Sequence, residues 1–91
     1  MQITKHARAR MQQRGIQRET VEILMEYGET IHCKGSGNKK IIFLSRKARR
    51  SAQGIQPDLG RIVKSRFPYL VIAENSDVIT AGHRTKKIRR H

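Results

Sequence analysis

The sequence predicts an α+β domain in which two N-terminal helices pack on an antiparallel sheet of about four strands. Two observations carry this prediction. Up to Gly28 the apolar residues recur at three- and four-residue intervals, as in helices, and after it they alternate or form short runs, as in strands. Residues that favour turns separate those runs. The 91 residues are expected to form a single domain, 1–91, with a basic tail from about residue 86.

Two helices are expected before Gly28. Thr4 is a favourable N-cap residue and Gly15 a favourable residue after a C-terminus, so the first helix is predicted over 5–14. The second is predicted over about 18–27, with Gly28 ending it. Its outer face is acidic and consists of Glu19, Glu22 and Glu26. Although two short helices joined by a glycine turn suggest a helix-turn-helix, that acidic face would repel DNA phosphates.

The rest of the chain is expected to form two hairpins, because the apolar period falls from about 3.6 to about 2 residues. The predicted strands are 30–34, 39–45, 67–74 and 78–84. The second strand is a near-continuous apolar run and is expected to be buried on both faces, while Pro68 suits the start of the third. The predicted turns are Gly35-Ser36-Gly37-Asn38 and Asn75-Ser76-Asp77.

The segment between the hairpins is basic. Residues 46–53 are expected to be a short basic helix or an exposed excursion, and 54–60 a loop. A further helical turn is expected over 58–65, capped by Asp58.

The net charge of +13, from 20 Lys and Arg against 7 Asp and Glu, predicts a polyanionic partner, with nucleic acid as the leading one. A membrane partner is not expected, since there is no run of about 18 apolar residues. The residues expected to bind nucleic acid are Lys5, Arg46, Lys47, Arg49, Arg50, Arg84, Lys86 and Lys87.

The first strand contains a histidine and the single cysteine. Alternation places His32 on the polar face of the strand and Cys33 with Ile31, so His32 is expected to be exposed and Cys33 to be a small buried residue. One cysteine cannot form an intrachain disulfide, which suits a reducing compartment. No signal segment is seen before the first helix, and a cytoplasmic location is expected.

The clearest functional pattern is the strip His6, Arg10 and Arg14, whose spacing of four places the three side chains on one side of the first helix. Cleavage of RNA without a metal needs proton carriers and fixed positive charge. His6 and His83 are candidate proton carriers, with Arg10, Arg14 and Arg84 supplying charge. Strand alternation, however, sends His83 and Arg84 to opposite faces.

Simpler interpretations of the same residues remain open. A basic helix face is commonly just solvated, and His83 would then be an edge-strand histidine that caps the sheet. No metal is expected, because the chain has no H-x-x-x-H, C-x-x-C or paired-carboxylate spacing. No cofactor is expected, because the small core, with 36% hydrophobic residues and no tryptophan, leaves no room for a deep pocket that encloses a large one. The segment 35–40 resembles a phosphate-binding loop only faintly, and a hairpin turn explains it better.

The chain resembles an uncharacterised bacterial domain family within the RelE/ParE-like toxin superfamily, which is grouped with colicin-type and barnase-like nucleases. The motifs that carry the resemblance are Ile3-Thr4-Lys5-His6-Ala7, Arg10-Met11, Arg14-Gly15-Ile16, Val21, Gly28 and a late Val-Ile-Thr strand. The resemblance implies a RelE-like α+β fold and RNA cleavage as the toxin half of a toxin-antitoxin pair. The resemblance also implies that the family's polar site positions correspond to His6, Arg10, Arg14 and Thr80 in this chain. The chain departs from the family at residues 81–84, where an aromatic residue is expected.

The predicted function is therefore that of a RelE-like toxin-type ribonuclease that needs no metal, with RNA or the ribosome as target and an antitoxin as protein partner. The alternatives are a non-catalytic nucleic-acid-binding or regulatory module, and an antitoxin-binding homologue without nuclease activity. The enzymatic prediction requires that the first helix and the last strand bring an imidazole and several guanidiniums into one partly sheltered groove.

Overall fold

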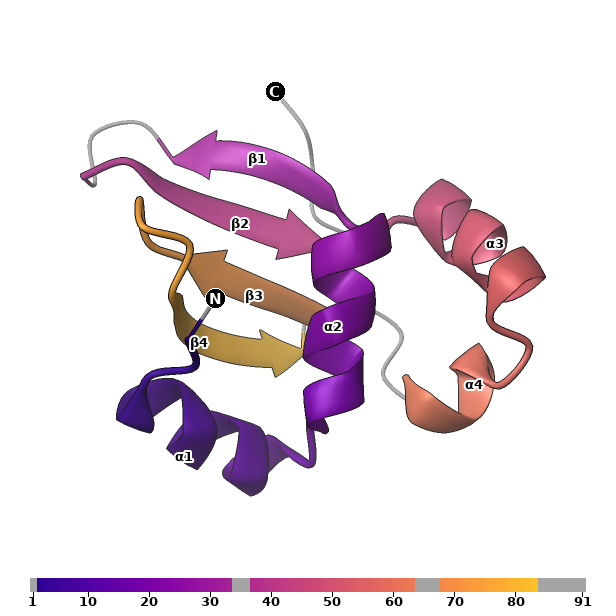
Figure 1. Ribbon diagram of the computed structural model, residues 1–91, viewed down its shortest axis with the longest axis horizontal. Helices are drawn as coiled ribbons and strands as arrows, with labels where there is room; N and C mark the ends of the chain where they lie inside the picture. Colours follow the sequence, from indigo (N-terminus) through magenta and orange to yellow (C-terminus); the bar gives the residue numbers. More distant parts are fainter. Residues whose placement is uncertain (1, 34–36, 64–67, 84–91) are drawn as a thin grey trace.

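The computed structural model describes residues 2–33, 37–63 and 68–83. Helices and strands follow in the order expected for an α+β fold, which confirms the predicted class (Figure 1). The helices are α1 (Lys5–Arg14), α2 (Arg18–Tyr27), α3 (Arg46–Ile55) and α4 (Leu59–Ile62). The strands are β1 (Glu29–Cys33), β2 (Lys39–Phe43), β3 (Pro68–Ile72) and β4 (Val78–His83).

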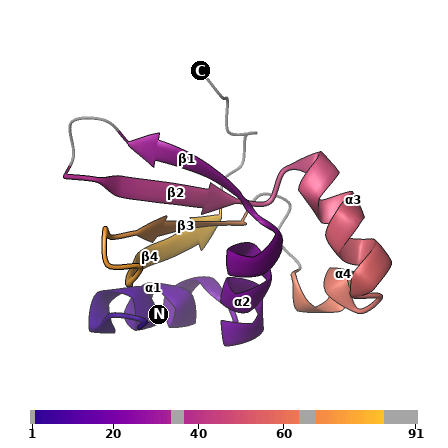
Figure 2. The ribbon, with the colours of Figure 1, turned by 45° about the horizontal axis from the view of Figure 1, so that its top comes forward.

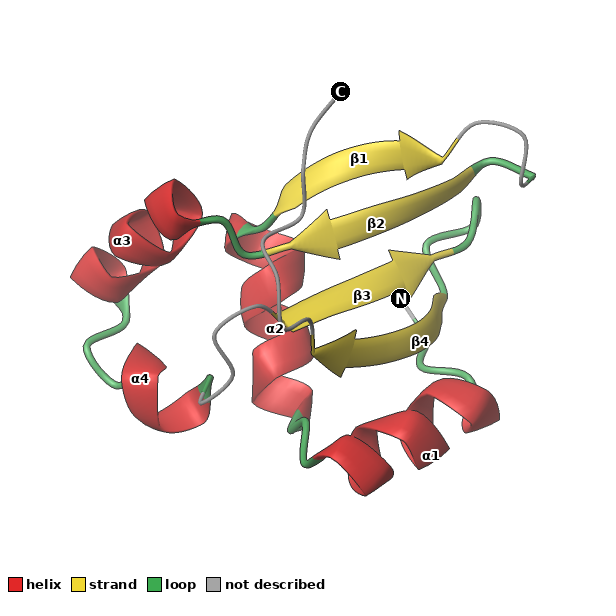
Figure 3. Cartoon of the chain, turned by 180° about the vertical axis from the view of Figure 1, so that it is seen from behind, coloured by secondary structure: helices red, strands yellow, loops and turns green. Residues whose placement is uncertain are grey.

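The four strands form one antiparallel sheet in the order β1-β2-β3-β4, so β1 and β4 are its edges. Helices α1 and α2 lie on the same side of this sheet (Figure 2). Seen from behind, the opposite face carries none of the helices in the described part of the chain (Figure 3). We call that face the open face.

Cross-strand registers show which residues point to each side of the sheet. The row Ile42–Leu70–Ala81 is buried in the hydrophobic core under the helices. The next row, Phe43–Tyr69–Gly82, therefore points to the open face, because neighbouring residues of a strand alternate. The row Ile31–Ile41–Val71–Thr80 lies on the open face too, and its residues are half-buried.

Helix α1 begins and ends where the sequence predicts. The Thr4 hydroxyl oxygen accepts a hydrogen bond from the amide of Ala7 at 3.1 Å. Gly15 takes the left-handed conformation, with φ 66°. The amide of Ile16 donates to the carbonyl of Met11 at 2.8 Å, which is the Schellman arrangement.

Helix α1 runs beside β4 in the same direction. At its start, the Thr4 amide donates to the carbonyl of Val78 at 3.1 Å, and Ile3 forms a parallel bridge with Val78. At its end, a guanidinium nitrogen of Arg14 donates to the carbonyl of Ala81 at 3.0 Å. The strip of α1 that includes Arg14 is thereby fixed along the edge of the sheet.

The middle of the chain differs from the predictions in three places. Strand β2 is buried on both faces only at its C-terminal end, where Ile42 on the core side and Phe43 on the open face are both buried, whereas Lys39 at its start is exposed. Helix α3 continues through 54 to Ile55, so 54–60 is not all loop. Helix α4 is shorter than 58–65, and the side chain of Asp58 does not cap it; its carboxylate instead lies 3.2 Å from Arg61. Residues 64 and 65 lie outside the described residues.

The predicted turn positions are confirmed where the structure describes them. Gly37 and Asn38 have positive φ in the first hairpin, and Ser76 has φ 72° in the second. His32 is exposed as expected, whereas Cys33 is only half-buried and free. The predictions for 34–36, for the strand start at 67 and for the tail lie outside the described residues.

Replacing Gly28 with alanine is expected to lower the free energy of unfolding by about 1–3 kcal/mol through overpacking. A Cβ there would collide with the carbonyl oxygen of Leu24 and the side chain of Ile42. Denaturant unfolding monitored by circular dichroism measures the loss. The matched control is Gly60→Ala, where nothing lies within 4 Å of the added methyl. Equal effects of the two substitutions would contradict the tight approach of α2 to β2.

Candidate nucleic-acid interface

The side chain of Arg14 crosses the free edge of β4. Its Nη1 donates to the carbonyl oxygen of Ala81 at 3.0 Å. Carbonyls that face away from a sheet at an edge strand have no ladder partner, and a guanidinium that binds one protects the edge. This hydrogen bond fixes the cation at one point of the strand.

Gly82 makes room for that cation on the open face. A Cβ at Gly82 would collide with Nη1 of Arg14 and would lie 2.7 Å from Oη of Tyr69. Tyr69 is the direct cross-strand partner of Gly82. A guanidinium and a phenol hydroxyl therefore meet above a residue without a side chain, and we call this arrangement the Arg14–Tyr69 corner. Among the described residues the Tyr69 hydroxyl has no hydrogen-bond partner.

Arg10 and Thr80 extend the corner along β4. Four helical residues rise about 6 Å, the length of about two strand residues, so Arg10 lies roughly level with Thr80. Arg10 is half-buried, and Thr80 belongs to the open-face row that includes Val71. Arg10 and Arg14 thus lie along α1, and Thr80 lies along β4, the strand that α1 runs beside.

His6 lies away from this corner. It is exposed, in the first turn of α1, and about 12 Å from Arg14 along the helix axis at 1.5 Å per residue. No hydrogen bond joins its ring to any residue that the structure describes. The strip predicted from helical spacing exists, but only its C-terminal part approaches the last strand.

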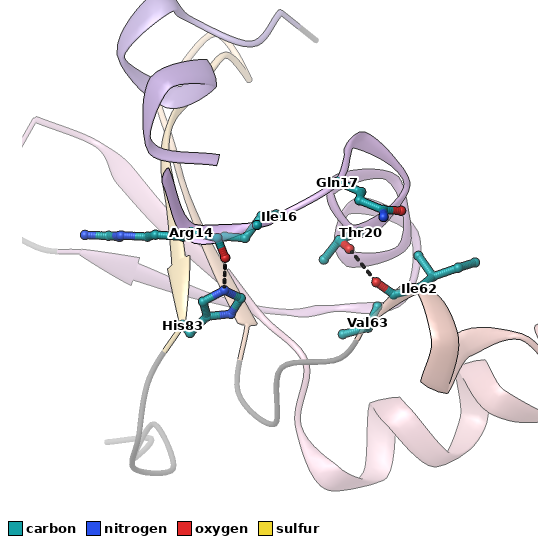
Figure 4. A pocket seen from close by; sticks show the side chains of 8 residues that line it. Arg14, Ile16, Gln17, Thr20, Ile62, Val63 and His83 are labelled. Carbon is teal, nitrogen blue, oxygen red and sulfur yellow. Dashed lines mark hydrogen bonds between the residues drawn. The ribbon is translucent and has the colours of Figure 1, made fainter. Parts of the chain in front are cut away.

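His83 lies on the other side of β4. Its Nε2 is 2.8 Å from the main-chain oxygen of Arg14 (Figure 4). A carbonyl oxygen can only accept, so Nε2 carries the proton. That oxygen is one of those left without a partner at the C-terminus of α1, and His83 caps it.

The common groove expected from the sequence is not formed. Gly82 faces the Arg14 guanidinium on the open face, and the next residue, His83, points to the helix side. The Arg14 side chain extends past β4 and away from the imidazole (Figure 4). The structure joins the two residues through the Arg14 main chain and separates their functional groups.

The other predicted contact residues are distributed over two elements. Lys5, Arg46, Lys47 and Arg50 are exposed. Arg49 is half-buried, and its Nη2 donates to the carbonyl of Val63 at 2.9 Å, which ties α3 to the end of α4. The positions Arg84, Lys86 and Lys87 lie outside the described residues.

Within 2–33, 37–63 and 68–83 there is no group of three or more His, Cys, Asp or Glu side chains that could hold a metal ion. None of the helices described is long and apolar enough to cross a bilayer.

Sequence reasoning missed Tyr69 and Gly82. The turn at 75–77 alone does not reveal their pairing, because a register shift between Val71 and Ile72 moves the alignment by one residue and so places Tyr69 opposite Gly82. An aromatic side chain was expected beside Thr80 from the same strand. The structure supplies one from the neighbouring strand instead.

His83→Ala is expected to lower the free energy of unfolding by about 0.5–1.5 kcal/mol, because the α1 carbonyl loses its hydrogen-bond donor. Urea unfolding measures the change. The control is His32→Ala, since His32 is exposed on an edge strand and should contribute nothing measurable. An unchanged stability in His83→Ala would show that the cap does not hold α1 to β4.

The fold and this corner define an α+β domain with a cationic, hydroxyl-bearing edge on an open antiparallel sheet. The chain belongs to the family described as Domain of unknown function (DUF4258), which matches it over residues 3–83. The prediction of membership in an uncharacterised domain family is thereby confirmed. Neither the comparison with curated proteins nor the comparison with solved structures finds a match.

Proposed function

We propose that the protein binds single-stranded RNA across the open face at β4 and cleaves it without a metal ion. The Arg14–Tyr69 corner carries the proposal, because a fixed guanidinium beside a hydroxyl is suited to a phosphodiester. Arg14 is exposed, so its unused donors can reach a bound phosphate.

Charge and shape support RNA as the ligand. The excess of 20 basic over 7 acidic residues attracts a polyanion. Beside the corner the open face presents Ile31, Ile41 and Val71, which are half-buried apolar residues of one cross-strand row. Unstacked bases of single-stranded RNA pack on such surfaces and on aromatic rings.

The corner supplies two requirements of RNA cleavage. The 2′-oxygen attacks phosphorus, the bond to the 5′-oxygen breaks, and a 2′,3′-cyclic phosphate forms. Arg14, with Arg10 behind it, stabilises the charge on the phosphorane. The Tyr69 hydroxyl donates a proton to the departing 5′-oxygen, and the proton of the 2′-hydroxyl leaves to solvent on this open face.

The proposal includes a place in the RelE/ParE-like toxin superfamily, with a cytoplasmic RNA or the ribosome as target. An antitoxin that neutralises such a cationic surface would be acidic where it contacts α1. Co-purification of an acidic protein with the full chain, released by salt, would support this part of the proposal.

One observation favours a second candidate, a non-catalytic RNA-binding module. The two histidines expected to carry protons are apart, since His6 is in the first turn of α1 and His83 caps its end. A binding module would keep the cations and need no proton carrier.

The test is incubation of the purified full chain with single-stranded RNA in the presence of a chelator, followed by analysis of the fragment ends. We expect fragments that end in a 2′,3′-cyclic phosphate and begin with a 5′-hydroxyl. Binding without cleavage would select the non-catalytic module. Affinity that does not fall with salt would contradict both functions, because counterion release makes RNA binding salt-dependent.

A further inference from the structure

A cleft of about 400 Å³ lies on the helix side of the end of β4. It is bounded by the α1–α2 turn at 15–17, by Ile62 and Val63 at the end of α4, and by the ring of His83 (Figure 4). This volume is within the range of pockets that bind small molecules, about 300–1,000 Å³. The cleft is separate from the Arg14–Tyr69 corner, which faces the other side of the sheet.

Part of the cleft wall is apolar. Ile16 and Val63 are buried and Ile62 is half-buried. The hydroxyl of Thr20, only 4% exposed, donates to the carbonyl of Ile62 at 3.3 Å and so is already used within the wall. An apolar wall next to polar groups suits a flat ring that carries donors and acceptors.

Two polar groups are available to a ligand. The Gln17 side chain is exposed and makes no capping bond to α2, so its amide offers a donor and an acceptor. Because Nε2 of His83 is bonded to the main-chain oxygen of Arg14, Nδ1 is the ring nitrogen left for a ligand. The guanidinium of Arg14 is held at Ala81 on the other side of the strand and adds no charge here. The described lining therefore favours a planar, neutral group with donors and acceptors over a phosphate.

We infer that this cleft binds one unpaired nucleobase of the RNA strand; the inference deepens the proposed function and rests on it. Arg14 links the two places, since its main-chain oxygen anchors His83 and its guanidinium lies at the corner. A strand held at the corner by a phosphate passes the end of β4 and can insert a neighbouring base into the cleft beside Ile16, with His83 at its edge.

The test is a titration of the full chain, labelled at isoleucine methyls, with each ribonucleoside 5′-monophosphate separately. We expect saturable shifts at Ile16 and Ile62 with a dissociation constant at or below about 1 mM, and no shifts at these methyls with ribose 5-phosphate. Gln17→Ala should weaken binding by about three- to tenfold, as for one lost neutral hydrogen bond. Gln12→Ala, an exposed glutamine of α1 outside the cleft, should leave it unchanged.

Equal shifts with ribose 5-phosphate, or no shifts with any nucleotide, would overturn the nucleobase pocket. Failure of the nucleobase pocket can be distinguished from failure of the proposed function. The proposed function is tested by RNA cleavage and by salt-dependent RNA binding. RNA cleavage without nucleotide shifts would reject the pocket alone. Nucleotide shifts at Ile16 and Ile62 without RNA binding would support the pocket and reject the proposed RNA function.

Discussion

Replacement of Arg14 by methionine is expected to reduce RNA cleavage by about 10²–10³-fold, the usual effect of removing a group that stabilises transition-state charge. Methionine keeps the apolar stem but removes the donors that bind Ala81 and the phosphate. Affinity for single-stranded RNA should also fall. The slope of log K against log salt should become shallower by about 0.7, the value for one lost phosphate contact on a single strand.

The matched control for Arg14→Met is Arg8→Met. Arg8 is exposed on the other flank of the Ala7–Met11 stripe of α1, so its loss removes the same net charge away from the corner. Cleavage and the salt slope should stay near those of the unchanged protein. Equal losses in the two variants would mean that only overall charge matters, which contradicts a site at Arg14. Urea unfolding checks that both variants remain folded.

Replacement of Tyr69 by phenylalanine is expected to reduce cleavage by about 10²–10⁴-fold, the range for a lost proton-transfer group. Affinity for RNA should change little, because the ring and the cations remain. Stability should also be nearly unchanged, since the hydroxyl has no hydrogen-bond partner in the described part of the chain. Single-turnover cleavage with protein in excess separates the chemical step from binding.

Tyr27→Phe is the control for Tyr69→Phe. Tyr27 is the last residue of α2, is half-buried and packs against the hydrophobic core. It lies on the helix side of the sheet, so its hydroxyl should not affect cleavage. If Tyr69→Phe cleaves RNA as fast as the unchanged protein, Tyr69 is not the proton donor and the mechanism proposed for the corner is wrong.

Local chemistry made much of the fold predictable. The bounds of α1 follow from Thr4 and Gly15, which act on their own neighbours in the chain. Asn38, Gly37 and Ser76 likewise determine turns by their own conformations. Asp58 shows the limit of such reasoning, because its carboxylate pairs with Arg61 rather than with the amides of α4.

The site was less predictable because its contacts join distant parts of the chain. Strand alternation gave the correct side for His83, but its partner is the main chain of Arg14, 69 residues away. The direction of the Arg14 guanidinium depends on a free carbonyl at Ala81 and on the missing side chain of Gly82. Helical spacing alone aligns Arg14 with His6 and cannot show that only one of them reaches the sheet.

The location of bound RNA is the most direct test of this account. Spectra of ¹⁵N-labelled arginine side chains would be recorded with and without a single-stranded RNA whose 2′-hydroxyls are methylated, so that it binds but is not cut. We expect the largest change at the Arg14 guanidinium, a smaller one at Arg10 and none at Arg8. Changes confined to the arginines of α3, with Arg14 unaffected, would show that RNA binds elsewhere and would contradict a site at the edge of β4.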